Sequence, residues 1–187
     1  RVLFRSAMLD QAHHLALHDP LTDLPNARLL RDRLFVAIQT ARRARSQVAV
    51  VFVDLDRFKP INDEYGHGMG DLVLKATAMR LRSGLRASDT VARLGGDEFV
   101  AILTHCQTRD DVEQTVERLI EQLQAPFRME GHVLSMSVSA GVALYPGDGR
   151  DAQTLIRCAD SAMYEVKRAG GNGFGFHASL NYERLMS

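Results

Sequence analysis

The hydrophobic and polar positions of this chain follow two periodicities, one typical of strands and one typical of amphipathic helices. Residues 48–53 form a short, mostly β-branched apolar run, which predicts a central strand buried on both faces. Residues 134–144 alternate between apolar and small or polar side chains, which predicts one long strand with a single buried face. Apolar residues at helical spacing predict four amphipathic helices, over 27–41, 71–85, 112–123 and 155–166.

Turn signals connect these segments into a mixed fold. Residues 90–94 and 99–103 are strand-like, and the glycines between them, Gly95 and Gly96, suit a hairpin turn with positive φ. Residues 174–177 predict an edge strand. In chain order, the elements predict an α/β fold of the α+β sandwich type, in which helices flank a central, antiparallel-rich, five-stranded sheet. We expect a linker helix at 1–17, one domain at 18–178 and a tail at 179–187.

Composition narrows the class of protein. The chain has 187 residues, 45% of them hydrophobic and 25% charged, which is typical of one globular domain and excludes intrinsic disorder. Its longest apolar run is far shorter than the ~20 residues of a membrane helix, so we expect no membrane contact from this fragment. A formal net charge of zero argues against a nucleic-acid partner.

Two cysteines, Cys106 and Cys158, belong to no disulfide or zinc pattern, which favours a reducing cytoplasm. The chain begins at Arg1 and carries no signal segment, so we interpret it as part of a longer protein.

Carboxylates stand where two of the predicted strands end. Asp54 and Asp56 follow the buried strand, and Asp97 and Glu98 occupy the hairpin turn. If the two strands are neighbours, these carboxylates converge, and such a cluster is unfavourable unless cations occupy it. Two Mg²⁺ ions and a nucleoside triphosphate would neutralise it. On its own, the pair Asp54 and Asp56 is equally well explained as a solvated turn.

Between these carboxylates lies a segment with three glycines, residues 62–71, which we expect to be a loop that opens a helix. Asn62 and Asp71 offer an amide and a carboxylate that match the edge of guanine. Asp71 is also a natural N-cap for the helix that follows, so both interpretations stay open.

Five ordered motifs together resemble the GGDEF family, the diguanylate cyclases. The signature is Gly95-Gly96-Asp97-Glu98-Phe99, and the resemblance covers about residues 17–176. The four other matching segments are 19–26, 54–59, 62–71 and 159–167.

The resemblance implies a fold related to class III nucleotide cyclases and polymerase palms. It also implies that two GTP molecules are condensed into cyclic di-GMP with release of two pyrophosphates, across a homodimer. The metal, Mg²⁺ or alternatively Mn²⁺, would be bound by Asp54, the carbonyl of Leu55 and Asp97. Glu98 would assist at the metal and in proton abstraction.

The same resemblance implies roles for other residues. Asn62 and Asp71 would recognise guanine, and Arg86 and Asp89 would form an inhibitory site for the product. The remaining residues implied to bind substrate are Phe58, Lys59, Gly95, Gly96 and Lys167.

Two positions depart from the family pattern. Asp23 stands where glycine is usual, which we expect to be tolerated. Gly171 stands where the family typically has an arginine that reaches the triphosphate, and the loss of one charged pair weakens binding by ~1.5–3 kcal/mol. Two alternatives to an active cyclase follow: a GTP-binding regulatory module that controls a neighbouring domain, and an effector that binds cyclic di-GMP. His14 and His18 lie one helical turn apart, but we interpret them as solvated linker residues.

Overall fold

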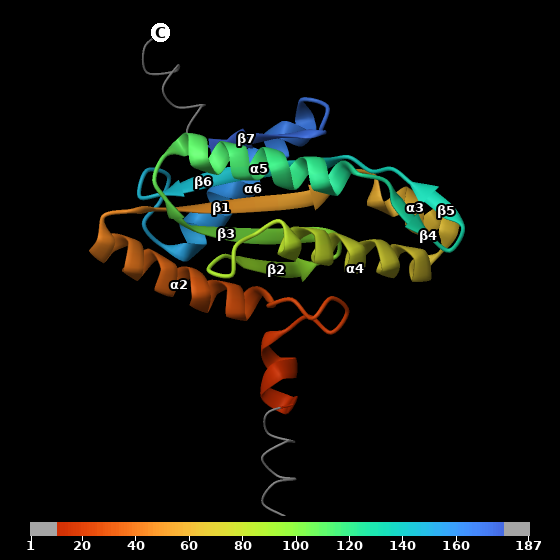
Figure 1. Ribbon diagram of the computed structural model, residues 1–187, viewed down its shortest axis with the longest axis horizontal. Helices are drawn as coiled ribbons and strands as arrows, with labels where there is room; N and C mark the ends of the chain where they lie inside the picture. The colour runs from red at the N-terminus through yellow and green to blue at the C-terminus, as the bar shows by residue number, and fades with distance from the viewer. Residues whose placement is uncertain (1–10, 178–187) are drawn as a thin grey trace, which may run out of the picture.

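In the computed structural model, which describes residues 11–177, a five-stranded sheet has helices on both faces (Figure 1). Residues 11–17 form a helix that projects from the body of the domain. The elements that follow are α2 (Ala27–Ala44), β1 (Gln47–Leu55), α3 (Phe58–Tyr65), α4 (His67–Ser83), β2 (Thr90–Gly95), β3 (Glu98–Cys106), α5 (Arg109–Gln124), β4 (Phe127–Met129), β5 (His132–Leu134), β6 (Val138–Tyr145), α6 (Ala152–Arg168) and β7 (Gly173–Phe176).

The sheet has the strand order β2-β3-β1-β6-β7. All neighbouring pairs are antiparallel except β6 and β7, which are parallel. β1 lies in the centre and is buried from Val48 onward, as its run of apolar residues predicts. Residues of α4 and α5 pack on one face of the sheet, and residues of α2 and α6 pack on the other. The predicted five-stranded, antiparallel-rich sheet flanked by helices is confirmed.

Local sequence signals account for the helix that precedes β1. The side chain of Asn26 accepts hydrogen bonds from the backbone N–H groups of Arg28 and Leu29, so it caps α2 as expected. The buried residues of α2 repeat at helical spacing and face β1 and its neighbours: Leu30, Leu34, Ile38 and Ala41.

The glycine-rich segment differs from the prediction. A loop was expected, but the segment is helical on both sides of Gly66. α3 runs to Tyr65, α4 begins at His67, and Gly66 lies between them at φ +85°. Asp71 therefore lies inside the first turns of α4, and its assignment as the N-cap is wrong. The two helices pack closely because Gly70 has no side chain: a Cβ there would lie 1.9 Å from Oδ1 of Asn62.

The long alternating strand also differs from the prediction. β5 ends at Leu134 and β6 begins at Val138, and β6 is buried on both faces. Gly141, one of the small residues of the alternating pattern, faces a helix and not solvent, whereas Ser135 is exposed and Ser139 donates to Asp56. At Gly141 a Cβ would lie 2.0 Å from the carbonyl oxygen of Ala159 in α6. Small side chains on a strand therefore signal a closely packed helix here.

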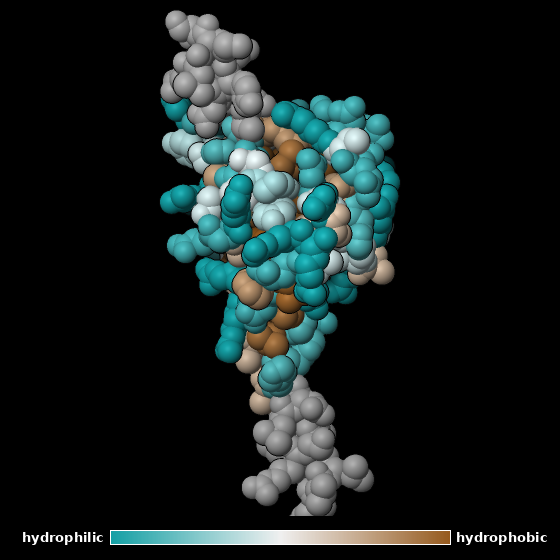
Figure 2. Space-filling model, turned by 90° about the vertical axis from the view of Figure 1, so that its left-hand side faces the viewer, coloured by the Kyte–Doolittle hydropathy of each residue, from teal (hydrophilic) through white to brown (hydrophobic). Residues whose placement is uncertain are grey.

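The surface is largely hydrophilic in the view of Figure 2, with hydrophobic residues gathered mainly in its lower half. Large hydrophobic residues that are exposed in the structure include Leu15, Phe35, Val36, Met79, Val133 and Tyr164. Within residues 11–177, no helix has the length and apolar character needed to cross a bilayer.

Candidate active site

The centre of the candidate site is the pairing of β1 with β3. Antiparallel register places Asp54, near the end of β1, opposite Glu98 at the start of β3. The backbone N–H of Leu55 donates to the carbonyl of Asp97 at 3.4 Å, so the end of β1 touches the signature turn. Gly95 and Gly96 form that turn with φ of +148° and +51°. The two strands are neighbours, as expected, so the end of β1 meets the signature turn.

A lysine from the far end of the chain completes this centre. Lys167 lies in the last turn of α6, and its Nζ is 2.6 Å from Oδ1 of Asp54. Asp54 is only 7% exposed, and its Oδ1 is buried without an aligned hydrogen bond. A buried carboxylate oxygen with one close cation and unused acceptor capacity suits further positive charge.

Electrostatics support the same conclusion. Burial raises the pKa of Asp54 to about 6, and the negative charges of Asp97 and Glu98 add to this effect while Lys167 opposes it. Burial also raises the pKa of Glu98, with smaller contributions from Asp160 and Asp97. A site that disfavours its own negative charges to this extent is a suitable place for a divalent cation.

Asp56 has a structural role beside this centre. Its carboxylate accepts hydrogen bonds from Oγ of Ser137 at 2.7 Å, from Oγ of Ser139 at 2.8 Å and from the backbone N–H of Asn172 at 3.1 Å. It thereby ties the end of β1 to β6 and to the loop after α6. Among the described residues, no three His, Cys, Asp or Glu side chains are grouped so as to hold a metal by themselves. Any metal here therefore needs backbone or phosphate oxygens as well.

The other residues implied to bind substrate lie on α3 and α4, which follow β1. Phe58 is buried at the start of α3 and Lys59 is exposed next to it. Asn62 lies on α3 with its side chain against Gly70 of α4. Asp71 is exposed on α4.

Sequence reasoning missed an ion pair that anchors the signature turn. Nη1 of Arg93 lies 3.0 and 3.1 Å from the two carboxylate oxygens of Asp19. Nε and Nη2 of the same guanidinium donate to the carbonyl of Gly96 at 3.0 and 2.8 Å. Arg93 stands two residues before Gly95, but nothing in the sequence shows that Asp19 lies beside it.

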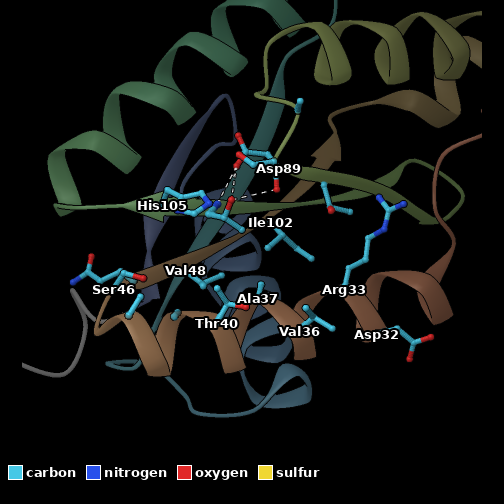
Figure 3. Close-up of a pocket in the computed structure, with 17 residues that line it drawn as sticks. Asp32, Arg33, Val36, Ala37, Thr40, Ser46, Val48, Asp89, Ile102 and His105 are labelled. Atoms are coloured by element: carbon cyan, nitrogen blue, oxygen red, sulfur yellow. Dashed lines mark hydrogen bonds between the residues drawn. The ribbon is translucent and has the colours of Figure 1, made fainter.

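Arg86 and Asp89, the expected inhibitory pair, lie together on the segment that joins α4 to β2. The carboxylate of Asp89 accepts hydrogen bonds from the backbone N–H of Arg86 at 3.1 Å and of Thr104 at 2.9 Å, so it also shapes the chain locally. Asp89 lines a cavity of about 600 Å³ beside α2, into which Val36 and Ile102 contribute apolar surface (Figure 3). Arg86 lines two other cavities, each of which also includes Asp89.

His14 and His18 of the linker helix contact each other and the loop that follows, and within residues 11–177 they belong to no group of three potential metal ligands. Nε2 of His14 lies 2.6 Å from Oδ1 of Asp23, and the rings of His14 and His18 stack with their centroids 3.9 Å apart. Asp23 has φ +60°, a conformation that glycine adopts most easily and aspartate tolerates. The unusual residue at this position therefore gains a partner on the linker helix.

A family model described as the diguanylate cyclase GGDEF domain matches residues 16–173. The chain belongs to the GGDEF family. The match contains every motif on which the resemblance is based.

Curated proteins similar to this GGDEF domain are longer than the chain itself. The bifunctional diguanylate cyclase/cyclic di-GMP phosphodiesterase MucR of Pseudomonas aeruginosa is 49% identical over 165 residues, which cover 88% of this chain and 24% of MucR. The diguanylate cyclase TpbB of the same species is 44% identical over 174 residues, which cover 92% of this chain and 40% of TpbB. The chain thus spans about a quarter to two fifths of these relatives.

Solved structures agree with the fold. The GGDEF domain of TpbB superposes with a TM-score of 0.84 at 44% identity, covering 90% of this chain and 98% of that one. The coiled coil and GGDEF domain of DgcB from Caulobacter crescentus, solved in complex with c-di-GMP, gives a TM-score of 0.83 at 27% identity, with 94% and 93% covered.

Proposed function

We propose that this GGDEF domain condenses two molecules of GTP into cyclic di-GMP and releases two pyrophosphates. The observation that carries the proposal is the pairing of Asp54 with Glu98, which brings the end of β1 to the signature turn. Its similarity to MucR and TpbB, both named as diguanylate cyclases, supports this activity for the domain. Because GTP is a cytoplasmic nucleotide, we place the reaction in the cytoplasm.

The acidic centre fits a pair of divalent cations, Mg²⁺ or alternatively Mn²⁺. Asp54, the carbonyl of Leu55 and Asp97 would hold them, with Glu98 beside them. Bound metal would neutralise the triphosphate and lower the pKa of the attacking hydroxyl. The raised pKa of Asp54 and its buried Oδ1, with capacity for another cation, support this assignment.

The protein's own residues would bind and orient the nucleotide. Asn62 and Asp71 would accept hydrogen bonds from guanine, and Lys167 would place its ammonium at the terminal phosphate. Phe58 and Lys59 would lie along the phosphates, and Gly95 and Gly96 would let the backbone approach them.

In each half-reaction, the 3′-oxygen of one GTP forms a bond to the α-phosphorus of the other. The bond from that phosphorus to the bridging oxygen of the β-phosphate breaks, and pyrophosphate leaves. Glu98 would take the hydroxyl proton, and its raised pKa suits a proton acceptor. Each domain carries one such site, so the two new bonds require a second copy facing the first, which makes a homodimer the active form.

The test is production of cyclic di-GMP by a forced dimer. The domain is fused behind a dimerising coiled coil and incubated with GTP and Mg²⁺, and the product is measured by mass spectrometry. Asp97→Asn is expected to abolish product while leaving the unfolding midpoint unchanged. Asp110→Asn, an exposed carboxylate in the first turn of α5, is the matched control and should retain activity. Turnover by Asp97→Asn at the wild-type rate would disprove the assigned role.

A second candidate function is a GTP-binding regulatory module without turnover. Gly171 favours it, because no side chain from this position can contact the phosphates. GTP binding by calorimetry, with no product from the forced dimer, would support this alternative.

We also propose that cyclic di-GMP inhibits the enzyme through Arg86 and Asp89. The arginine can stack on guanine and grip phosphate, and its partner Asp89 lies close by. Arg86→Ala is expected to relieve inhibition by added product and leave the initial rate unchanged. Inhibition of equal strength in this variant would contradict the proposal.

A further inference from the structure

A second cavity adjoins the acidic centre where α6 ends. It has a volume of about 620 Å³. Lys167 lines it and also lies 2.6 Å from Asp54, so this side chain connects the wall of the cavity to the candidate active site. The opposite walls come from the segment that joins β1 to α3, including Arg57, and from the loop after α6, including Gly171.

The charges around this cavity favour an anion. Arg57 and Lys167 are its cationic lining residues, and Asp56 is its one acidic lining residue. The carboxylate of Asp56 is already satisfied by its hydrogen bonds from Ser137, Ser139 and Asn172. Lys167 shares its charge with Asp54, so Arg57 is the lining cation that no carboxylate of the described residues pairs with.

Arg57 is well suited to meet such an anion. It is exposed, and within residues 11–177 no carboxylate forms an ion pair with it. Its φ is +57°, a strained conformation for a residue with a side chain, and strain of this kind concentrates at functional sites. A planar guanidinium can donate two parallel hydrogen bonds to one phosphate group.

The loop opposite Arg57 cannot easily supply another side chain. Gly171 has φ +71°, and a Cβ there would lie 3.0 Å from Oδ2 of Asp56 and 3.2 Å from Oγ of Ser139. A larger residue would press on the carboxylate that anchors this loop. The cavity is thus open on the side of Gly171 and cationic on the side of Arg57.

We propose that Arg57 binds the terminal phosphates of the nucleotide together with Lys167. The ligand class is an oligophosphate of at least two phosphate groups, carried by a guanine nucleotide. The inference rests on the proposed function, because it takes the nucleotide to bind at Asp54 and Lys167. It assigns to Arg57 a charge that the chain lacks at position 171.

Calorimetry on the domain in Mg²⁺ tests the role of Arg57. The probes are 3′-deoxy-GTP, which has no attacking hydroxyl, GMP, which has no terminal phosphates, and inorganic triphosphate. Arg57→Gly is expected to weaken binding of 3′-deoxy-GTP and of triphosphate by about tenfold to a hundredfold. It should leave GMP binding within about twofold, because one charged contact is lost only where terminal phosphates exist. Arg57→Lys should give an intermediate loss of affinity, since an ammonium keeps the positive charge but cannot donate two parallel hydrogen bonds to one phosphate group.

The glycine variant separates binding from folding. Glycine relieves the backbone strain at φ +57°, so its unfolding midpoint should equal or exceed that of the wild type while its affinity falls. Arg168→Ala is the matched control, because Arg168 is 66% exposed, pairs with Glu165 and does not line the cavity. It should bind 3′-deoxy-GTP as the wild type does.

Each contrary result has a distinct meaning. Unchanged affinity of Arg57→Gly for 3′-deoxy-GTP overturns the role of Arg57 and leaves the proposed function standing. An equal loss for GMP and 3′-deoxy-GTP also overturns it, since Arg57 would then act through the placement of α3. If the wild type binds triphosphate but discriminates against guanine nucleotides, the guanine part of the proposal is overturned. If the wild type binds none of the probes, both proposals fail.

Discussion

Substitution of Gly141 by alanine tests how closely α6 must approach the sheet. A Cβ at this position would lie 2.0 Å from the carbonyl oxygen of Ala159 and 2.2 Å from the backbone nitrogen of Met163. Ordinary contact begins at 3.4 Å, and both neighbours are backbone atoms that no rotamer change can move. The whole of α6 must therefore shift away from β6.

The expected loss of free energy of unfolding follows from the atoms that collide, a new methyl group and the backbone of α6. Added methyl groups in well-packed cores usually cost ~1–3 kcal/mol, and a clash with backbone belongs at the upper end or beyond it. For a domain of this size ~3 kcal/mol lowers the unfolding midpoint by ~6–12 °C. Lys167 lies on the displaced helix, so its ion pair with Asp54, now 2.6 Å long, should also lengthen and activity should fall.

Thermal and urea unfolding of Gly141→Ala are compared with those of Gly173→Ala. Gly173 lies on the neighbouring strand β7, and a Cβ there would meet nothing within 4 Å. The control should therefore unfold at the wild-type midpoint or slightly above it, since alanine restricts the unfolded chain. Midpoints for the two variants that agree within about 2 °C would refute the reasoning that α6 touches β6 through this glycine.

Two further predictions concern a buried thiol and a helix contact. Burial raises the pKa of the Cys106 thiol to about 11 from an ordinary 9.0. As pH rises, the thiol of the unfolded chain therefore loses its proton before that of the folded chain. The thiol's contribution to the free energy of unfolding is lost as pH rises from about 9 towards 11. Between about pH 8 and pH 10.5 the wild type should lose ~2 kcal/mol more free energy of unfolding than Cys106→Ala, and parallel pH profiles would contradict this. Gly70→Ala should displace Asn62 and weaken GTP binding about tenfold by calorimetry, whereas Gly68→Ala, with nothing within 4 Å, should not; equal affinities would show that Asn62 is not held through Gly70.

Much of the fold follows from short stretches of sequence. The β-branched run at 48–53 predicts β1, the glycines at 95 and 96 predict the hairpin, and Asn26 predicts the start of α2, and the structure confirms each. These features depend on side chains a few residues apart, so local periodicity and capping are sufficient to predict them. The same rules failed where a distant element buries a residue: the strand pattern at 134–144 did not reveal that α6 covers Gly141.

The site depends on tertiary structure. Sequence motifs identified the carboxylates of Asp54, Asp97 and Glu98, but only the antiparallel register places Asp54 opposite Glu98. Only packing of α6 brings Lys167 to Asp54. These contacts join residues far apart in the chain, and strand register and helix packing are set by burial across the whole domain, which no local pattern contains. The sequence thus predicted which carboxylates form the site, whereas the fold determined which charges lie next to one another in it.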